Sequence, residues 1–223
     1  MRHLEDVERF RFDLVESGKE DSRIEYYTAC YEACIPKSFW NISGDGINFN
    51  EEVFRRIVCT YVRKHKIAAK KGYGLLFLGD NGTGKTTFMS FILTQMLKRG
   101  YSVYYTTLAQ LDIDIKRSFH DRDWDRRLEQ AFDSNFMAVD EIGKEHYRSD
   151  SYLNTRLELL LKRRNDNNDP TLLSTNLDYN SLSDMYGASI TSMLEGKYLR
   201  VAMESGDFRK KVYSDMERNM GFR

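Results

Sequence analysis

The sequence has few cysteines, the residues that mark disulfide-rich secreted proteins and structural zinc sites. Its 223 residues include three cysteines, Cys30, Cys34 and Cys59, which cannot form a complete set of disulfides. Cys30 and Cys34 have no second Cys or His pair at zinc-site spacing, so we expect ordinary thiols and no metal site there.

Long apolar runs and a secretory leader are also missing. The longest apolar runs, such as 75–78 and 91–93, fall far short of the roughly 20 residues that cross a bilayer. The first six residues carry charges at once and form no apolar stretch, unlike a signal peptide. We therefore expect a cytoplasmic protein without a membrane partner.

Neither sign of charge is in excess. Lys plus Arg and Asp plus Glu number 34 each, so no global field drives the chain onto nucleic acid. The local distribution is less even, because residues 1–29 hold eight acidic and five basic residues, whereas 51–71 hold seven basic and two acidic. Any contact with DNA must therefore be local.

Prolines are scarce, and no Gly/Ser-rich linker divides the chain. Only Pro36 and Pro170 occur, while a 41% hydrophobic content can build a core. The apolar period predicts helices at 4–15, at 22–33 and, after a connector, from Phe54 to about Lys70. We expect a helical extension at 1–50, which docks a partner or forms a solvated flank, and a main domain at 51–223.

From Gly72 onward, apolar runs of strand length alternate with helical patterns. This alternation predicts an α/β fold, in which helices flank a parallel five-stranded sheet. The strands are expected at 73–78, 102–106, 135–140, 171–175 and 198–203. The helices are expected at 85–99, 107–133 in two pieces, 149–164, 178–194 and after Asp207.

The strongest motif lies between the first of these strands and its helix. Its pattern, G-x4-G-K-[ST], is typical of a phosphate-binding loop in that context, which disfavours a turn without a ligand. Backbone N–H groups of such a loop surround the β-phosphate at a helix N-terminus. Lys85 should reach the β- and γ-phosphates of ATP, and the Thr86 hydroxyl should ligate Mg²⁺. The nucleotide-binding residues are Gly79, Asp80, Asn81, Gly82, Thr83, Gly84, Lys85, Thr86 and Thr87.

An apolar strand downstream ends in two carboxylates, Asp140 and Glu141. Asp140 should lie beside the phosphate loop, where it can hold Mg²⁺ through water. A second carboxylate directly after it can orient and deprotonate an attacking water, as an ATPase requires. A small-molecule phosphotransferase has no need of that base, and an acidic strand end without catalytic function is the plainer alternative.

Another apolar strand ends at Thr175 and Asn176. Because its neighbour in the sheet should be the strand before the phosphate loop, Asn176 could hydrogen-bond the γ-phosphate or the attacking water. The alternative is that these polar residues cap the helix expected at 178–194.

Together, the loop, the Val139 to Gly143 stretch and the Pro170 to Asn176 strand resemble the AAA+ ATPases of the DnaC/IstB-like branch. The resemblance implies strands in the order 5-1-4-3-2, Asn176 as sensor 1 and Arg209 as a sensor-2-like arginine. It also implies ATP and Mg²⁺ as cofactors, a replicative helicase as partner, loading on single-stranded DNA, and an oligomer in the ATP-bound or partner-bound state. A transposition helper that binds DNA and recruits a transposase is the alternative.

The chain departs from that branch where an arginine finger is usual. Ser189 and Met193 stand at the positions of the expected arginines. Arg163, Arg164 or Arg200 could substitute, although ordinary surface charge is the simpler interpretation.

A DNA track is less clearly indicated. Basic and aromatic residues alternate as in single-strand binders, but three aspartates lie among them, which favours a solvated helical pair. The track would comprise Lys116, Arg117, Phe119, Trp124, Arg126 and Arg127.

Overall fold

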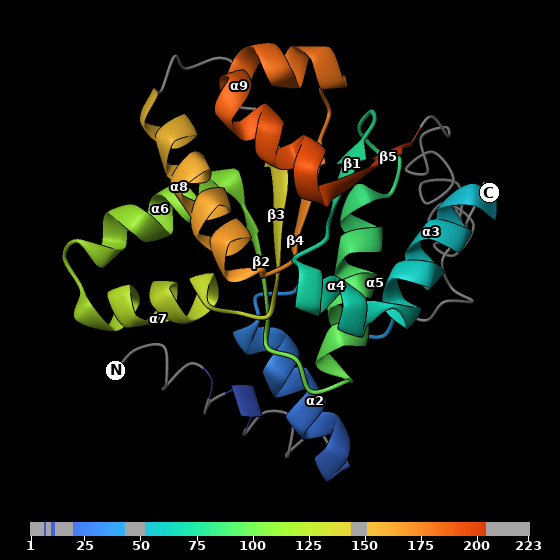
Figure 1. The fold of residues 1–223 in the computed structure, drawn as a ribbon. Helices are drawn as coiled ribbons and strands as arrows, with labels where there is room; N and C mark the ends of the chain where they lie inside the picture. Colours follow the sequence, from blue (N-terminus) through green and yellow to red (C-terminus); the bar gives the residue numbers. More distant parts are fainter. Residues whose placement is uncertain (1–6, 8–9, 12–19, 43–51, 144–150, 204–223) are drawn as a thin grey trace, which may run out of the picture.

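The computed structural model describes residues 7, 10, 11, 20–42, 52–143 and 151–203. At its centre is a five-stranded parallel sheet in the order β2-β3-β4-β1-β5 (Figure 1). All five predicted strands and their predicted order are confirmed. The strands are β1 Gly74–Leu78, β2 Val103–Thr107, β3 Phe136–Ile142, β4 Thr171–Thr175 and β5 Tyr198–Ala202.

Helices cover both faces of the sheet, which makes three layers (Figure 1). Because side chains alternate along a strand, Leu75 and Phe77 enter one core and Leu76 and Leu78 enter the other. The first face is covered by α2 Asp21–Glu32, α3 Glu52–Arg63, α4 His65–Lys71 and α5 Lys85–Leu97. The second is covered by α6 Leu108–Ser118, α7 Arg122–Phe132, α8 Ser151–Asn167 and α9 Tyr179–Lys197.

Local sequence explains where several helices begin. The side chains of Thr107, Asp121 and Asp178 accept hydrogen bonds from first-turn N–H groups of α6, α7 and α9. These caps satisfy donors that a helix cannot pair internally. Inside α9, Gly187 has φ 75° and ψ −178°, so the helix bends there.

One predicted helix is divided in the structure, and two others lie largely or wholly outside the described residues. The basic helix predicted up to Lys70 is divided at Lys64, so it forms α3 and α4, and α4 ends at Gly72 with φ 68°. Most of the helix predicted at 4–15, and all of that expected after Asp207, lie outside the described residues.

The segment before α3 contributes to the main core. Cys30, Ile35 and Trp40 are buried in the same cluster as Val58 and Phe77. A short 3₁₀ turn, Lys37–Phe39, lies within this segment. The division into 1–50 and 51–223 therefore stays a prediction. Across the described residues, no helix combines the length and apolar character needed to cross a membrane.

Candidate phosphate-binding site

The phosphate loop joins the carboxyl end of β1 to the first residue of α5. Gly79, Gly82 and Gly84 have positive φ angles of 151°, 86° and 91°, which favour glycine. A Cβ added at Gly79 would lie 2.3 Å from the Met203 carbonyl oxygen, so no larger residue fits. Gly84 caps α5 without a side-chain acceptor. First-turn N–H groups of α5 are therefore positioned for an anion.

The Lys85 side chain folds back over this loop. Its side chain is buried, and Nζ donates to the carbonyl oxygens of Gly79 and Asp80 at 2.6 and 2.8 Å. Thr83 steadies the same turn by donating to the Asp80 carbonyl at 2.9 Å. The ammonium group is thus held within the concave loop, where phosphate oxygens could replace or share these carbonyl acceptors.

Asp140 lies at the centre of a buried hydrogen-bond cluster. Only 2% of the residue is exposed. Oδ2 accepts from Thr86 Oγ1 at 2.6 Å and from the Tyr105 hydroxyl at 2.7 Å. Oδ1 accepts from Ser174 Oγ and from the Glu141 N–H at 2.9 Å. These four donors satisfy the hydrogen-bonding capacity of a carboxylate that lies inside the protein.

The tyrosine in this cluster remains a donor at physiological pH. Burial is the main cause that raises the pKa of the Tyr105 phenol, and the adjacent Asp140 carboxylate raises it further. A protonated phenol beside an acceptor-only carboxylate must donate.

The oxygen donors fit Mg²⁺. Thr86 and Asp140 present a hydroxyl and a carboxylate beside the phosphate loop. Mg²⁺ usually keeps several waters and takes one or two protein oxygens together with substrate phosphates. The described residues contain no group of three or more His, Cys, Asp or Glu that could hold a metal ion.

Glu141 differs from Asp140 although the two are adjacent. It is exposed, has φ 62°, and lies in an irregularity of the β3–β4 register between Val139 and Ile142. Its N–H also contacts Ser174 Oγ at 3.0 Å. Left-handed backbone at a non-glycine residue is unfavourable and is found preferentially at functional sites. The exposed carboxylate at this edge of the sheet is compatible with the predicted base.

Asn176 connects the fourth strand to the loop. Its Nδ2 donates to Asn81 Oδ1 at 2.9 Å. The capping alternative is not what the structure contains, because Asp178 caps α9. The Leu78 to Thr175 pairing of β1 and β4 explains how Asn176 reaches the loop.

The substitute arginines have different surroundings. Arg164 is fully buried, so both interpretations of it, a substitute finger and the favoured ordinary surface charge, are wrong. Its guanidinium donates to Thr171 and to the carbonyls of Phe132, Ser134 and Pro170.

Burial lowers the pKa of Arg164 to about 10, so the group still carries its charge at neutral pH. Leu157, Leu160, Leu161 and Arg164 follow the helical period, and that sequence signal would have placed position 164 in the core.

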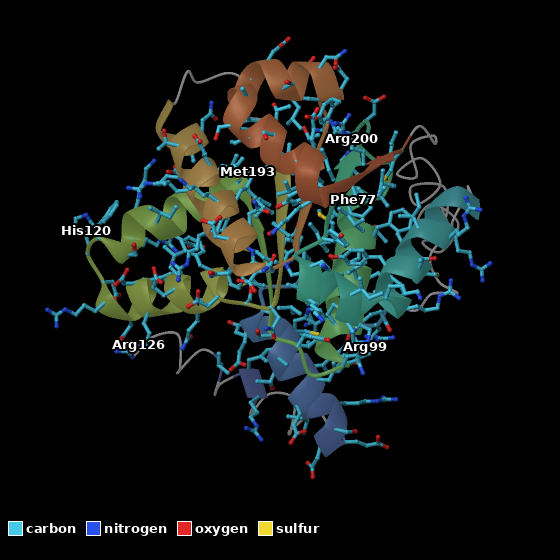
Figure 2. All side chains as sticks on the ribbon, in the orientation of Figure 1. Phe77, Arg99, His120, Arg126, Met193 and Arg200 are labelled. Atoms are coloured by element: carbon cyan, nitrogen blue, oxygen red, sulfur yellow. The ribbon has the colours of Figure 1, made fainter. Side chains whose placement is uncertain are left out.

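The other two arginines lie nearer the surface. Arg163 pairs with Glu129 and Asp133 at 2.8 and 2.7 Å. Arg200, a residue of β5 that is labelled in Figure 2, has its guanidinium carbon 3.3 Å from the Tyr179 ring centroid. Arg209 lies outside the described residues, so its sensor role stays a prediction.

The suggested DNA track is largely occupied by its own contacts. Guanidinium groups of Arg117 and Arg127 lie 5.2 and 5.0 Å from the Trp124 ring centroid. Lys116 pairs with Asp112 at 2.6 Å, whereas Phe119 is 62% exposed. These contacts fit the solvated helical pair, and binding to DNA stays a prediction.

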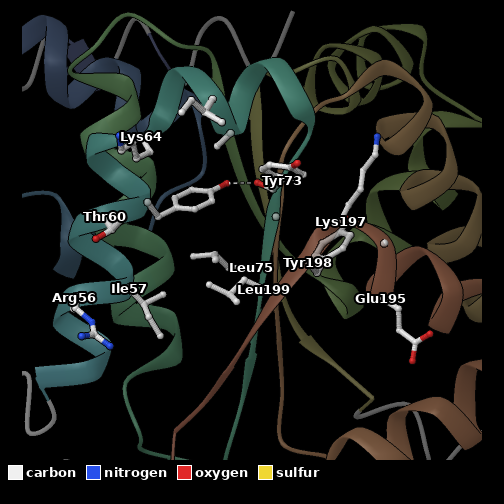
Figure 3. A pocket seen from close by; sticks show the side chains of 15 residues that line it. Arg56, Ile57, Thr60, Lys64, Tyr73, Leu75, Glu195, Lys197, Tyr198 and Leu199 are labelled. Atoms are coloured by element: carbon white, nitrogen blue, oxygen red, sulfur yellow. Dashed lines mark hydrogen bonds between the residues drawn. The ribbon is translucent and has the colours of Figure 1, made fainter.

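Figure 3 shows an apolar groove beside α3 and α4. Its volume is about 590 Å³, and it is lined by α3, α4 and the first residues of β1 and β5, Gly74 and Tyr198. Since the phosphate loop follows the opposite, carboxyl end of β1, this groove is separate from the phosphate site.

Sequence reasoning missed Tyr105 and Ser174. Both are hydroxyl residues on buried strands, and their alternate positions place them on the α5 face with Phe77 and Ala138. A polar residue at such a position must find a partner, and that signal was available.

Known proteins resemble this chain in sequence. The family of IstB-like ATP binding proteins matches residues 48–198. The replicative helicase loader DnaC of Buchnera aphidicola subsp. Baizongia pistaciae is 24% identical over 185 residues, 81% of this chain and 74% of that protein. An IS21-like insertion-sequence ATP-binding protein of Bacteroides fragilis is 30% identical over 73 residues, 33% of this chain and 37% of that protein.

A solved structure shares the fold. The crystal structure of the DnaC helicase loader has a TM-score of 0.66 at 20% identity, and covers 76% of this chain and 100% of that chain. The sheet and its helices thus have the fold of that loader. Since the family match spans more than half of the sequence and includes the phosphate loop, the chain belongs to the IstB-like ATP-binding proteins.

Proposed function

We propose that this protein is an ATP-hydrolysing switch that loads or remodels a replicative helicase on single-stranded DNA. The observation that carries the proposal is the hydrogen bond from Asn176 to Asn81, because it couples the end of β4 to the phosphate loop. A side chain with this contact can respond to a γ-phosphate and pass the change to the sheet. Similarity to a DnaC loader over 81% of this chain supports the choice of partner.

In the proposed reaction, a water attacks the γ-phosphorus, the bond to the β–γ bridging oxygen breaks, and ADP and phosphate leave. Lys85 binds the β- and γ-phosphates, Glu141 orients and deprotonates the water, and Asn176 contacts the γ-phosphate or the water. Mg²⁺, held by Thr86 and through water by Asp140, neutralises phosphate charge when bound. Arg209 would act near the γ-phosphate as a second sensor.

The source of an arginine finger is part of the proposal. Ser189 and Met193 carry no charge, and Ser189 donates to Glu158 Oε1 at 2.5 Å. A finger accelerates related phosphoryl transfers by about 10³ to 10⁵. We therefore propose slow turnover by the protein alone, with no gain in rate as its own concentration rises. Either the partner or DNA supplies the missing charge, or the protein acts as a slow ATP-bound clamp.

Two variants test the ATPase. Lys85→Ala should weaken ATP binding by roughly 30-fold or more, since it removes a charge-assisted contact of about 2 to 3 kcal/mol. Glu141→Gln should retain ATP and stop turnover, because it keeps the size of the side chain and removes the base. Fluorescence titration and phosphate release measure the two effects.

Unchanged ATP affinity in Lys85→Ala would contradict the assignment of the phosphate site. Normal turnover by Glu141→Gln would show that another group is the base. Lys66→Ala, on the exposed surface of α4, is the control for loss of a cation and should leave ATP affinity unchanged.

A transposition helper is the second candidate. It is favoured by the IstB-like family match and by the IS21-like relative. Such a protein would prefer duplex DNA and would bind a transposase in a pull-down. ATP-bound Glu141→Gln protein can therefore be used as bait in parallel with a purified hexameric helicase and a transposase, and titrated with single-stranded and duplex DNA. Recovery of the helicase with single-strand preference supports loading, whereas the opposite pair of results supports transposition.

A further inference from the structure

The carboxylate of Asp140 is held by groups from three neighbouring elements. Asp140 lies on the central strand β3, between β2 and β4. Tyr105 comes from β2, Ser174 from β4 and Thr86 from α5. Each flanking strand thus supplies one hydroxyl, and the helix after the phosphate loop supplies the third.

The two carboxylate oxygens have different partners. Oδ1 accepts from Ser174 and from the Glu141 backbone, whereas Oδ2 accepts from Thr86 at 2.6 Å and from Tyr105 at 2.7 Å. A hydroxyl has one proton and two lone pairs, so Thr86 can donate to Oδ2 and still offer a lone pair to a cation. That double use requires Oδ2 to stay in place.

Rotation of the terminal carboxylate of Asp140 would move Oδ2 away from the Thr86 hydroxyl. The χ2 torsion of aspartate is broad, so donors at both oxygens fix the plane of the group. Of the two donors to Oδ2, Tyr105 is the one that does not also face the ion. Tyr105 is 8% exposed and packs in the same core as Ala138, which fixes its ring by contacts independent of Asp140. Its hydroxyl is therefore a rigid donor to Oδ2.

We propose that Tyr105 is a positioning residue for magnesium, which holds Asp140 Oδ2 against the Thr86 hydroxyl so that the two oxygens face one ion. The inference rests on the proposed Mg²⁺-ATP function. Residues that orient metal-binding groups typically change metal affinity by about 10- to 100-fold when they are removed. A purely structural phenol would have no such effect.

The test is Tyr105→Phe, which removes one oxygen and keeps the ring. A fluorescent ATP analogue is titrated at increasing Mg²⁺ and also in EDTA. We expect the Mg²⁺ concentration for half-maximal tightening to rise about tenfold, with binding in EDTA unchanged. Tyr105→Met is the second variant, should the first fail to fold, because it also removes the hydroxyl and keeps an apolar side chain.

Tyr104→Phe is the matched control. Tyr104 is 7% exposed, is adjacent in sequence, and lies in the core on the other face of the sheet, away from Asp140. It should keep the wild-type Mg²⁺ dependence. If wild type requires Mg²⁺ and Tyr105→Phe requires the same concentration, the positioning role is overturned while the proposed function stands. If wild type binds no ATP at all, the proposed function fails, and this inference fails with it.

Discussion

Asp140 and Arg164 are both charged and buried, and the groups around them differ. Asp140, at the carboxyl end of β3, accepts from three hydroxyls and one backbone N–H. Arg164, on α8, donates to three backbone carbonyls and to Thr171. Neither is satisfied mainly by an opposite charge, although both lie where water has almost no access.

The difference separates a site that can bind a ligand from one that only supports the fold. Hydroxyls around Asp140 have rotatable protons and spare lone pairs, so they can share the carboxylate with an ion. Backbone carbonyls around Arg164 are fixed by the ends of α7, β3 and β4 and offer no place for a ligand. Burial of a charge alone therefore does not identify a functional residue.

The largest effect is expected at Arg164. Arg164→Ala removes the donor to the carbonyls of Phe132 and Ser134 and opens space in the core. The Pro170 carbonyl loses one of its two donors, because it also accepts from the Met137 N–H. We expect the free energy of unfolding to fall by about 3 to 5 kcal/mol, because a cavity and unpaired buried carbonyls are left behind. Urea denaturation followed by circular dichroism measures this. A loss below about 1 kcal/mol would show that water or rearranged side chains replace the guanidinium.

A smaller loss of stability, but a clear loss of ligand binding, is expected at Asp140. Asp140→Asn keeps the shape, and the Thr86 and Tyr105 hydroxyls can rotate to meet the amide. We expect the free energy of unfolding to change by less than about 2 kcal/mol, while the Mg²⁺-dependent gain in ATP affinity falls about tenfold or more. Urea denaturation measures the first effect, and calorimetric titration of ATP with and without Mg²⁺ measures the second. Equal loss of stability in the Asp140 and Arg164 variants would remove the contrast between them.

The smallest effect is expected at Arg163, the sequence neighbour of Arg164. Arg163→Ala breaks exposed pairs with Glu129 and Asp133, so it should change the free energy of unfolding by less than about 1 kcal/mol. It also tests the remaining finger candidate on α8. ATPase rates measured against protein concentration should match those of wild type. A loss confined to the concentration-dependent part of the rate would instead identify Arg163 as a finger.

Much of the fold and part of the site were predictable from local patterns. Alternating strand and helix patterns indicated all five strands, and the resemblance gave their order. The phosphate loop was found because its residues are contiguous, and Asp140 and Asn176 because each follows an apolar strand. The division of the basic helix at Lys64 was not predicted, because the apolar period continues through it.

The sequence by itself determined where phosphate chemistry could occur, because a nest of backbone N–H groups needs glycines and a lysine at fixed spacing along one stretch of chain. Tertiary structure decided which side chains complete it. Tyr105 and Ser174 meet Asp140 only because β2 and β4 flank β3 in a particular register. Arg164 is structural only because its position on α8 brings it to the carbonyls at the end of α7 and before β3 and β4. A hydrogen bond between distant residues depends on that register and burial, which no local pattern contains.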